Sequence, residues 1–160
     1  MSIINTLVDL IYGTKRVVKS YQNKYPDQEV IAASGVKAVR STPQTEIKTG
    51  AHWVTAKRAV AILTNDKIVC KDWVISHEDI KSVELIRFKS LLSKGQLLNI
   101  TTNEDIGYQL GMQRNADWTK CKNLKLNYVD RKIKMSTFSI ILRLVLVGYI
   151  AYLLYKRFLQ

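Results

Sequence analysis

The sequence has few cysteines, which cross-link small domains, and few prolines and glycines, which interrupt regular secondary structure. It contains two cysteines, two prolines and seven glycines in 160 residues. Cys70 and Cys121 are too few for a disulfide framework or a cysteine-rich metal site, and neither belongs to a C-x-x-C pair. We therefore expect both to be reduced packing residues. The small share of Gly and Pro excludes collagen-like and low-complexity chains, and a chain of this length can bury a core without staples.

Acidic residues are also scarce. The chain has 13 Asp and Glu against 25 Lys and Arg, a net charge of +12, and more than half of this charge falls after Ala116. Such an excess is typical of proteins that bind nucleic acid or an anionic membrane. The three tryptophans lie among apolar neighbours and not between basic residues, which argues against a nucleic-acid interface. The hydrophobic share of 47% excludes a disordered composition.

Motifs that carry chemistry are absent. The sequence contains no phosphate-binding loop, no dinucleotide fingerprint, no nucleophile elbow and no H-E-x-x-H. The triplet His77, Glu78 and Asp79 invites a metal-site interpretation, but adjacent side chains of an extended segment point to opposite faces. We interpret it as a loop that leads into a strand. The sequence predicts no catalytic residue, no metal site and no cofactor, and hence no enzyme.

A long hydrophobic run lies near the C-terminus. From Phe138 to Tyr155 the chain carries one charge, Arg143, and about 20 helical residues span the roughly 30 Å of a hydrocarbon core. One central arginine costs roughly 3 kcal/mol, which the apolar residues offset. The pattern predicts a transmembrane helix over residues 137–157, in which Arg143 either snorkels to the headgroups or, with Tyr149 and Tyr152, contacts a partner within the membrane.

Basic residues flank this run at both ends. A basic juxtamembrane segment over residues 131–136 precedes it, no secretory signal opens the chain, and the run ends close to the C-terminus. These features favour a tail anchor whose main domain faces the cytosol. The basic residues expected to contact anionic lipid headgroups are Arg131, Lys132, Lys134, Lys156 and Arg157.

The N-terminal segment has helical spacing. Apolar residues recur every three to four positions within residues 1–25, which predicts an amphipathic helix. Lys15, Arg16 and Lys19 give its second half a basic face. Two interpretations are open: a helix that lies on the membrane surface, or one packed on the main domain or on a partner protein.

The middle of the chain has the pattern of a small β domain. Short β-type runs separated by turn residues recur from Val30 to Met112, about seven in number, as in a sandwich or barrel. Residues 116–128 then place Trp118, Cys121, Leu124 and Tyr128 on one face of a predicted closing helix, which Asp117 could cap.

The order of these blocks resembles the GRAM and bacterial PH-like domains. The residues that match their pattern are Gly50, Trp53, Thr55, Arg58, Asp79, Ile80 and Val83. The resemblance covers roughly residues 28–128. It implies an α+β, mainly β fold: a seven-stranded bent sandwich or barrel capped by one helix, over residues 28–130. It also implies that basic residues at one end bind anionic headgroups or partners, here Lys57 and Arg58, whose alternative is a solvated hairpin turn.

These features predict a non-catalytic, single-pass membrane protein whose cytosolic PH-like domain docks onto partners. The favoured function is an accessory or assembly subunit of a larger membrane protein complex. The alternative is an adaptor that binds anionic membrane lipids through the same domain. Because PH-like folds serve both purposes, the fold alone does not decide between them.

Overall fold

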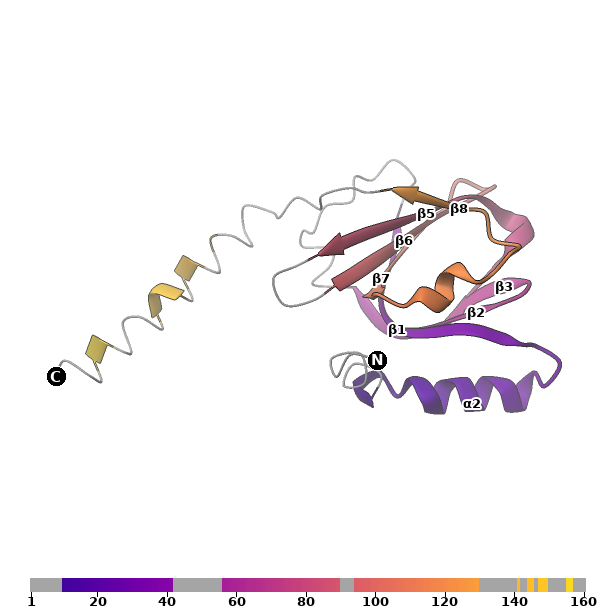
Figure 1. The fold of residues 1–160 in the computed structure, drawn as a ribbon, viewed down its shortest axis with the longest axis horizontal. Helices are drawn as coiled ribbons and strands as arrows, with labels where there is room; N and C mark the ends of the chain where they lie inside the picture. Colours follow the sequence, from indigo (N-terminus) through magenta and orange to yellow (C-terminus); the bar gives the residue numbers. More distant parts are fainter. Residues whose placement is uncertain are drawn as a thin grey trace. The chain divides into compact units, whose positions relative to one another are not determined.

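The computed structural model describes residues 10–41, 56–89 and 94–129, together with residues 141, 144, 145, 147–149, 155 and 156. The chain divides into two compact units, Met1–Thr45 with Ala56–Lys132, and Glu46–Thr55 with Ile133–Gln160. The named elements all lie in the first unit (Figure 1). They are α2 (Thr14–Lys24), β1 (Val30–Ser41), β2 (Lys57–Thr64), β3 (Lys67–Cys70), β4 (Trp73–Ser76), η1 (His77–Asp79), β5 (Ile80–Lys89), β6 (Lys94–Thr102), β7 (Gly107–Gln113), η2 (Ala116–Thr119) and β8 (Leu126–Val129).

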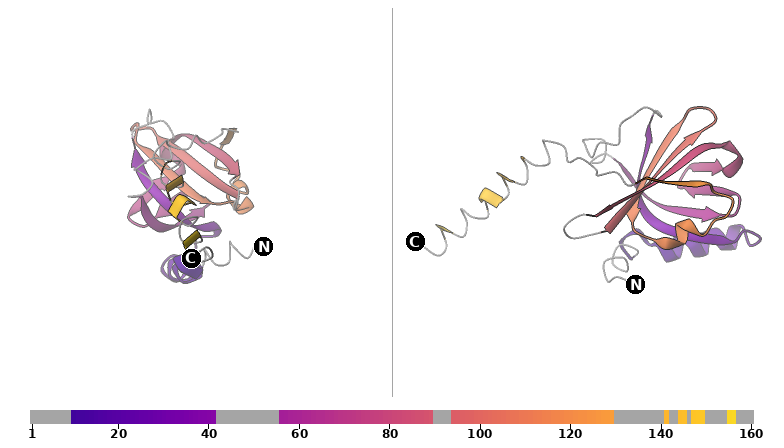
Figure 2. Two further views of the ribbon diagram at one scale, coloured as in Figure 1. Left: turned by 90° about the vertical axis from the view of Figure 1, so that its left-hand side faces the viewer. Right: turned by 45° about the horizontal axis from the view of Figure 1, so that its top comes forward.

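The described strands form one eight-stranded sheet in the order β4-β3-β2-β1-β7-β6-β5-β8. Neighbouring strands are antiparallel, except that β8 runs parallel to β5. The sheet curls into a half-barrel with an inner and an outer face (Figure 2). Because side chains alternate along a strand, β1 turns Ala32, Val36 and Ala38 to the inner face and Gly35 and Lys37 to the outer face.

The core fills the inner face. Apolar residues from β1 to β7 line it, and Trp118, Cys121 and Leu124, which come after β7, close it. Trp118 is fully buried, and its Nε1 donates to Ser34 Oγ at 3.0 Å. Burying an indole this completely stabilises the fold only because its N–H has a partner. On the outer face, α2 packs against β1 and β2, and Tyr21 of the helix clusters with Val60 and Ile62 of β2 (Figure 1).

Two parts of the predicted β fold are wrong. The described chain has eight strands in one curled sheet and not seven in a sandwich capped by a helix. The predicted closing helix over residues 116–128 is instead the short 3-10 helix η2, a crossing segment and the strand β8. The spacing that suggested a helix is satisfied without one, because η2 and the crossing segment bury Trp118, Cys121 and Leu124 against the sheet. Gly50, Trp53 and Thr55, which match the family pattern, lie outside the described residues.

The predicted transmembrane helix over residues 137–157 is also corrected. Within the part of the chain that the structure describes, no helix is both long and apolar enough to cross a membrane. Most of residues 137–157 lie outside the described residues. The prediction rested on the hydropathy of the run together with its tyrosines and basic flanks.

Candidate functional site

An open groove lies between residues 11–17 and the outer face of β2. It has a volume of about 440 Å³. We call it the α2–β2 groove. Its apolar lining is unusually accessible, since Ile11 is 66% exposed and Val17 39% exposed. Arg58 and Lys71 bring two cationic groups to the same hollow. The lining residues are Ile11, Tyr12, Val17, Arg58, Ala59, Val60 and Lys71.

One glycine fixes how closely the wall of the groove approaches the sheet. The ring of Tyr12 lies over Gly35 on the outer face of β1, where an added Cβ would be only 2.5 Å from Tyr12 Cγ. A side chain at position 35 would therefore push the tyrosine off the sheet. The glycine allows Tyr12 to pack flat against β1, which forms one wall of the groove.

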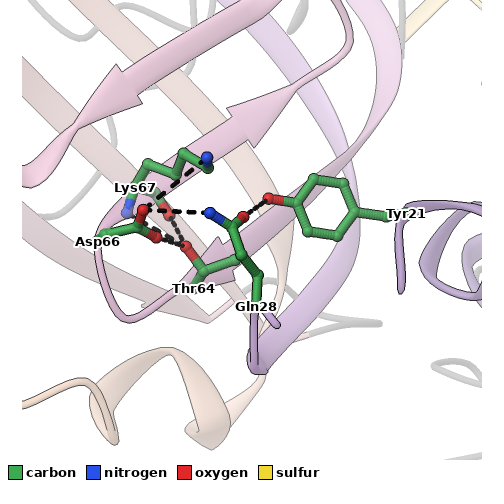
Figure 3. A network of polar contacts seen from close by, with 5 residues as sticks. All are labelled: Tyr21, Gln28, Thr64, Asp66 and Lys67. Atoms are coloured by element: carbon green, nitrogen blue, oxygen red, sulfur yellow. Dashed lines mark hydrogen bonds and ion pairs between the residues drawn. The ribbon is translucent and has the colours of Figure 1, made fainter. Parts of the chain in front are cut away.

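A polar network ties the far end of α2 to the β2–β3 turn (Figure 3). The Tyr21 hydroxyl donates to Gln28 Oε1, and Gln28 Nε2 donates to Asp66 Oδ2 at 3.3 Å. Thr64 Oγ1 donates to Asp66 Oδ1 at 2.5 Å, and Lys67 lies 3.8 Å from the same carboxylate. These contacts hold the helix along the sheet, so that its N-terminal end stays over β2.

The network shifts the titration of two of its members. The hydrogen bond from Thr64 holds the pKa of Asp66 below its ordinary value, and the charge of Lys67 lowers it further. Burial raises the pKa of the Tyr21 hydroxyl, and the nearby Asp66 carboxylate raises it further. At neutral pH the carboxylate is therefore charged and the phenol neutral, the states in which both hydrogen bonds form.

Positive charge on the groove wall is concentrated by strand register. Lys37 of β1 is directly opposite Arg58 of β2, and both residues point to the outer face. Like charges directly opposite each other destabilise an antiparallel pair. Among the described residues, no carboxylate lies within ion-pair distance of Lys37, Arg58 or Lys71. Within the described part of the chain, the wall is therefore a cationic surface without a carboxylate counterion.

Lys71 is placed by an uncommon backbone conformation. It occupies the two-residue loop between β3 and β4 with φ of 54°, in the left-handed region that non-glycine residues rarely adopt. Such strained positions cluster at binding and active sites. Here the conformation puts the Lys71 side chain beside both the groove and a second, smaller cavity.

The smaller cavity lies at the same edge of β2 and reaches the inner face. It has a volume of about 10 Å³ and is lined by Ala38, Lys57, Ala59, Cys70, Lys71, Asp72 and Trp73. Trp73 packs against Tyr108 with ring centroids 5.2 Å apart, which fixes one wall. Burial raises the pKa of the Cys70 thiol to about 11, with Asp72 adding to the shift. Cys70 is therefore a protonated packing residue and not a nucleophile.

The structure brings together only part of the predicted site. Lys57 and Arg58 lie on β2 beside the groove, on opposite faces of the sheet. Lys15, Arg16 and Lys19 are exposed on α2, while Tyr149 and Lys156 are exposed in the second unit. The remaining predicted residues lie outside the described residues: Arg131, Lys132, Lys134, Arg143, Tyr152 and Arg157.

The triplet at residues 77–79 forms η1. Within the described residues, no group of three His, Cys, Asp or Glu side chains could hold a metal ion. The backbone N–H of His77 donates to Asp66 O at 2.8 Å, and burial lowers the pKa of its imidazole. Its position therefore fits a packing role at the end of β4.

Sequence reasoning missed Lys37, Lys71 and the apolar lining of the groove. Lys37 could be paired with Arg58 only by knowing the register between β1 and β2. The left-handed backbone of Lys71 has no signal in a Cys-Lys-Asp-Trp sequence. Ile11 and Val17 are part of the helical apolar pattern, but the pattern does not say which of its members the sheet leaves uncovered.

Comparison with known proteins adds little to this description. No family model matches the chain, and no curated protein matches it in sequence. Among solved structures, the C-terminal domain of an unknown protein from Leishmania infantum is similar, with 12% sequence identity and a TM-score of 0.41. The match covers 65% of this chain and 91% of that domain. At these values the likeness supports no inference about function.

Proposed function

We propose that this chain is a non-catalytic docking protein that holds an acidic segment of a partner protein in the α2–β2 groove. It would thus serve as an accessory subunit of a larger assembly. The observation that carries the proposal is the pairing of exposed apolar lining with uncompensated positive charge. Ile11 and Val17 offer apolar contact area, while Arg58 and Lys71 have no carboxylate partner among the described residues.

Charge complementarity selects the chemistry of the occupant. An acidic side chain near Arg58 would relieve the repulsion between Arg58 and Lys37, which face each other across β1 and β2. Aliphatic side chains in the same segment would cover Ile11 and Val17, both of which are exposed to water. A segment with alternating acidic and aliphatic residues meets both needs.

The test measures binding of the full chain to a defined peptide array. Heptapeptides carry Glu, Lys, Leu or Ser at positions 2, 4 and 6 and Thr elsewhere. We expect peptides that combine Glu with Leu to bind best. Arg58→Glu and Lys71→Glu should each weaken binding about tenfold, because reversing an exposed charge replaces attraction with repulsion. Arg58→Glu should also shift the preference toward Lys-containing peptides.

Lys122→Glu provides the matched control. It makes the same charge change at an exposed residue, next to Asn123, whose Nδ2 donates to Asn65 O at the opposite end of β2. This variant should keep the wild-type preference. An array without preference for Glu over Lys would overturn the proposal. Binding to phosphatidylserine vesicles with no peptide binding would also overturn it and would identify a lipid-binding domain instead.

A further inference from the structure

Strand β2 extends beyond the strand that flanks it. On one side, β1 pairs with β2 along its length, from Thr64 to Lys57. On the other side, β3 pairs with only three residues, ending where Ala61 faces Cys70. The chain then turns away into β4 through Lys71 and Asp72. Among the described strands, none pairs with this side of β2 over Lys57–Val60.

The register shows which residues present backbone groups to this open edge. A two-residue loop makes Cys70 and Trp73 a hydrogen-bonded pair, so the N–H and C=O of Cys70 point toward β4. Because backbone groups alternate in direction along a strand, the N–H and C=O of Val69 point toward β2. Those of Ile62, its partner on β2, therefore point toward β3. The same alternation turns the backbone groups of Arg58 and Val60 away from β1, while Ala59 and Ala61 bond to β1.

Both cavities open at this edge. The α2–β2 groove lies on the outer side of Lys57–Val60 and the 10 Å³ cavity on the inner side, and Ala59 and Lys71 line both. An added strand projects successive side chains to opposite faces of a sheet. One set would enter the large groove, beside Arg58 and Lys71. The other set would lie over the small cavity, which has room only for small side chains.

We infer that the partner segment binds as an extra β-strand along Lys57–Val60, with acidic and aliphatic side chains in the groove and small ones on the inner side. This inference rests on the proposed function and adds the mode of binding. Backbone hydrogen bonds to Arg58 and Val60 would give affinity, and the groove would give specificity.

The charges at the edge favour a different protein over a second copy of this chain. Two copies paired edge to edge would bring Lys57, Arg58 and Lys71 of one copy near the same residues of the other. Lysines and arginines at an open edge are a common device against such self-pairing. An acidic strand turns the same residues into attractive contacts.

Amide hydrogen exchange of the full chain tests the open edge directly. In the free protein, the amides of Arg58 and Val60 should exchange much faster than those of Ala59 and Ala61. The Thr-spaced Glu-Leu-Glu heptapeptide should slow Arg58 and Val60 by at least tenfold and leave Ala59 and Ala61 unchanged. Equal protection of all four amides in the free protein would overturn the inference. Protection that grows with protein concentration alone would overturn it in favour of self-pairing.

Backbone methylation of the same peptide separates the two proposals. N-methylation of one alternating set of peptide residues should abolish binding, while methylation of the other set should leave it within about twofold. Equal effects of both sets, with the preference for Glu kept, would reject the strand and leave the docking proposal standing. If no peptide on the array binds, both proposals fail.

Discussion

At the residue scale, the groove depends on a glycine, Gly35, which has no side chain to displace Tyr12. Gly35 lies in the middle of β1, where the residue pattern gives no reason for a break, and its missing Cβ makes room for Tyr12. Lys71 shows the opposite situation: its backbone has a left-handed conformation that glycine adopts more readily, yet the position carries a long side chain. Both residues shape the groove through backbone conformation and packing, and Lys71 also brings a positive charge to it.

Gly35→Ala should lower the free energy of unfolding by about 1–3 kcal/mol, because the new methyl group overlaps the Tyr12 ring. Urea denaturation measures the effect. In a Tyr12→Ala background the same change should cost much less, since the ring is gone. An equal cost in both backgrounds would show that contact with Tyr12 is not the cause.

Cys70 should be chemically inert in the folded protein. Its thiol is buried, and with a pKa of about 11 only about one molecule in a thousand is a thiolate at pH 8. In a Cys121→Ala variant, reaction with Ellman's reagent at pH 8 should be at least a hundredfold slower in buffer than in urea. Rapid labelling in buffer would contradict the described burial.

At the element scale, α2 is held to the sheet at two places. The apolar contacts of Tyr21 with Val60 and Ile62 fix its face, and the network through Gln28 and Asp66 fixes its end. The helix has an exposed basic side and few apolar residues beyond those on the sheet. Its docking therefore depends on a small number of contacts, and those of the Asp66 carboxylate are sensitive to acid.

The folded protein should lose stability in acid through Asp66. The pKa of Asp66 is lower in the folded chain than its ordinary value of 3.8, so its contribution is present above that value. The contribution is lost as the pH falls through the folded pKa. Urea unfolding between pH 2 and 6 should show a flatter profile for Asp66→Asn than for the wild type. Thr64→Val, which removes the main cause of the shift, should flatten it similarly; unchanged profiles would exclude this role.

At the scale of the whole unit, the half-barrel is stabilised by what fills it. An open curled sheet leaves its inner face exposed unless another segment covers it, and the crossing segment after β7 supplies Trp118, Cys121 and Leu124. Asn115 supports the crossing by donating to Ser34 Oγ at 3.3 Å and by accepting from the backbone N–H of Asp117 at 2.9 Å. One short segment therefore completes the core that eight strands share.

Trp118→Ala should lower the free energy of unfolding by about 3–5 kcal/mol, the usual range for removing a buried aromatic side chain. Trp118→Phe should cost less, because it keeps most of the volume and loses only the bond to Ser34. Chemical denaturation monitored by circular dichroism measures both. A small effect of Trp118→Ala would mean that the inner face is closed by other residues.

Short β-type runs between turn residues predicted the β character of the domain. The helical spacing within residues 1–25 predicted a helix, and α2 forms over Thr14–Lys24. The three-residue spacing of Trp118, Cys121 and Leu124 wrongly predicted a helix after Ala116. These side chains are buried against the sheet by η2 and the crossing segment instead. The groove lay beyond sequence reasoning for a different reason. It depends on the register that places Lys37 opposite Arg58, and on the residues of β2 that extend beyond its pairing with β3.

The parallel strand β8 has a consequence for the order in which the chain folds. The strands β5, β6 and β7 can pair as successive hairpins, but β8 joins β5 only after the chain has crossed the inner face. Closing such a long loop is slow relative to forming local hairpins. The pairing of β8 should thus follow the β5–β6 and β6–β7 hairpins, and until it forms one side of β5 is an unpaired edge.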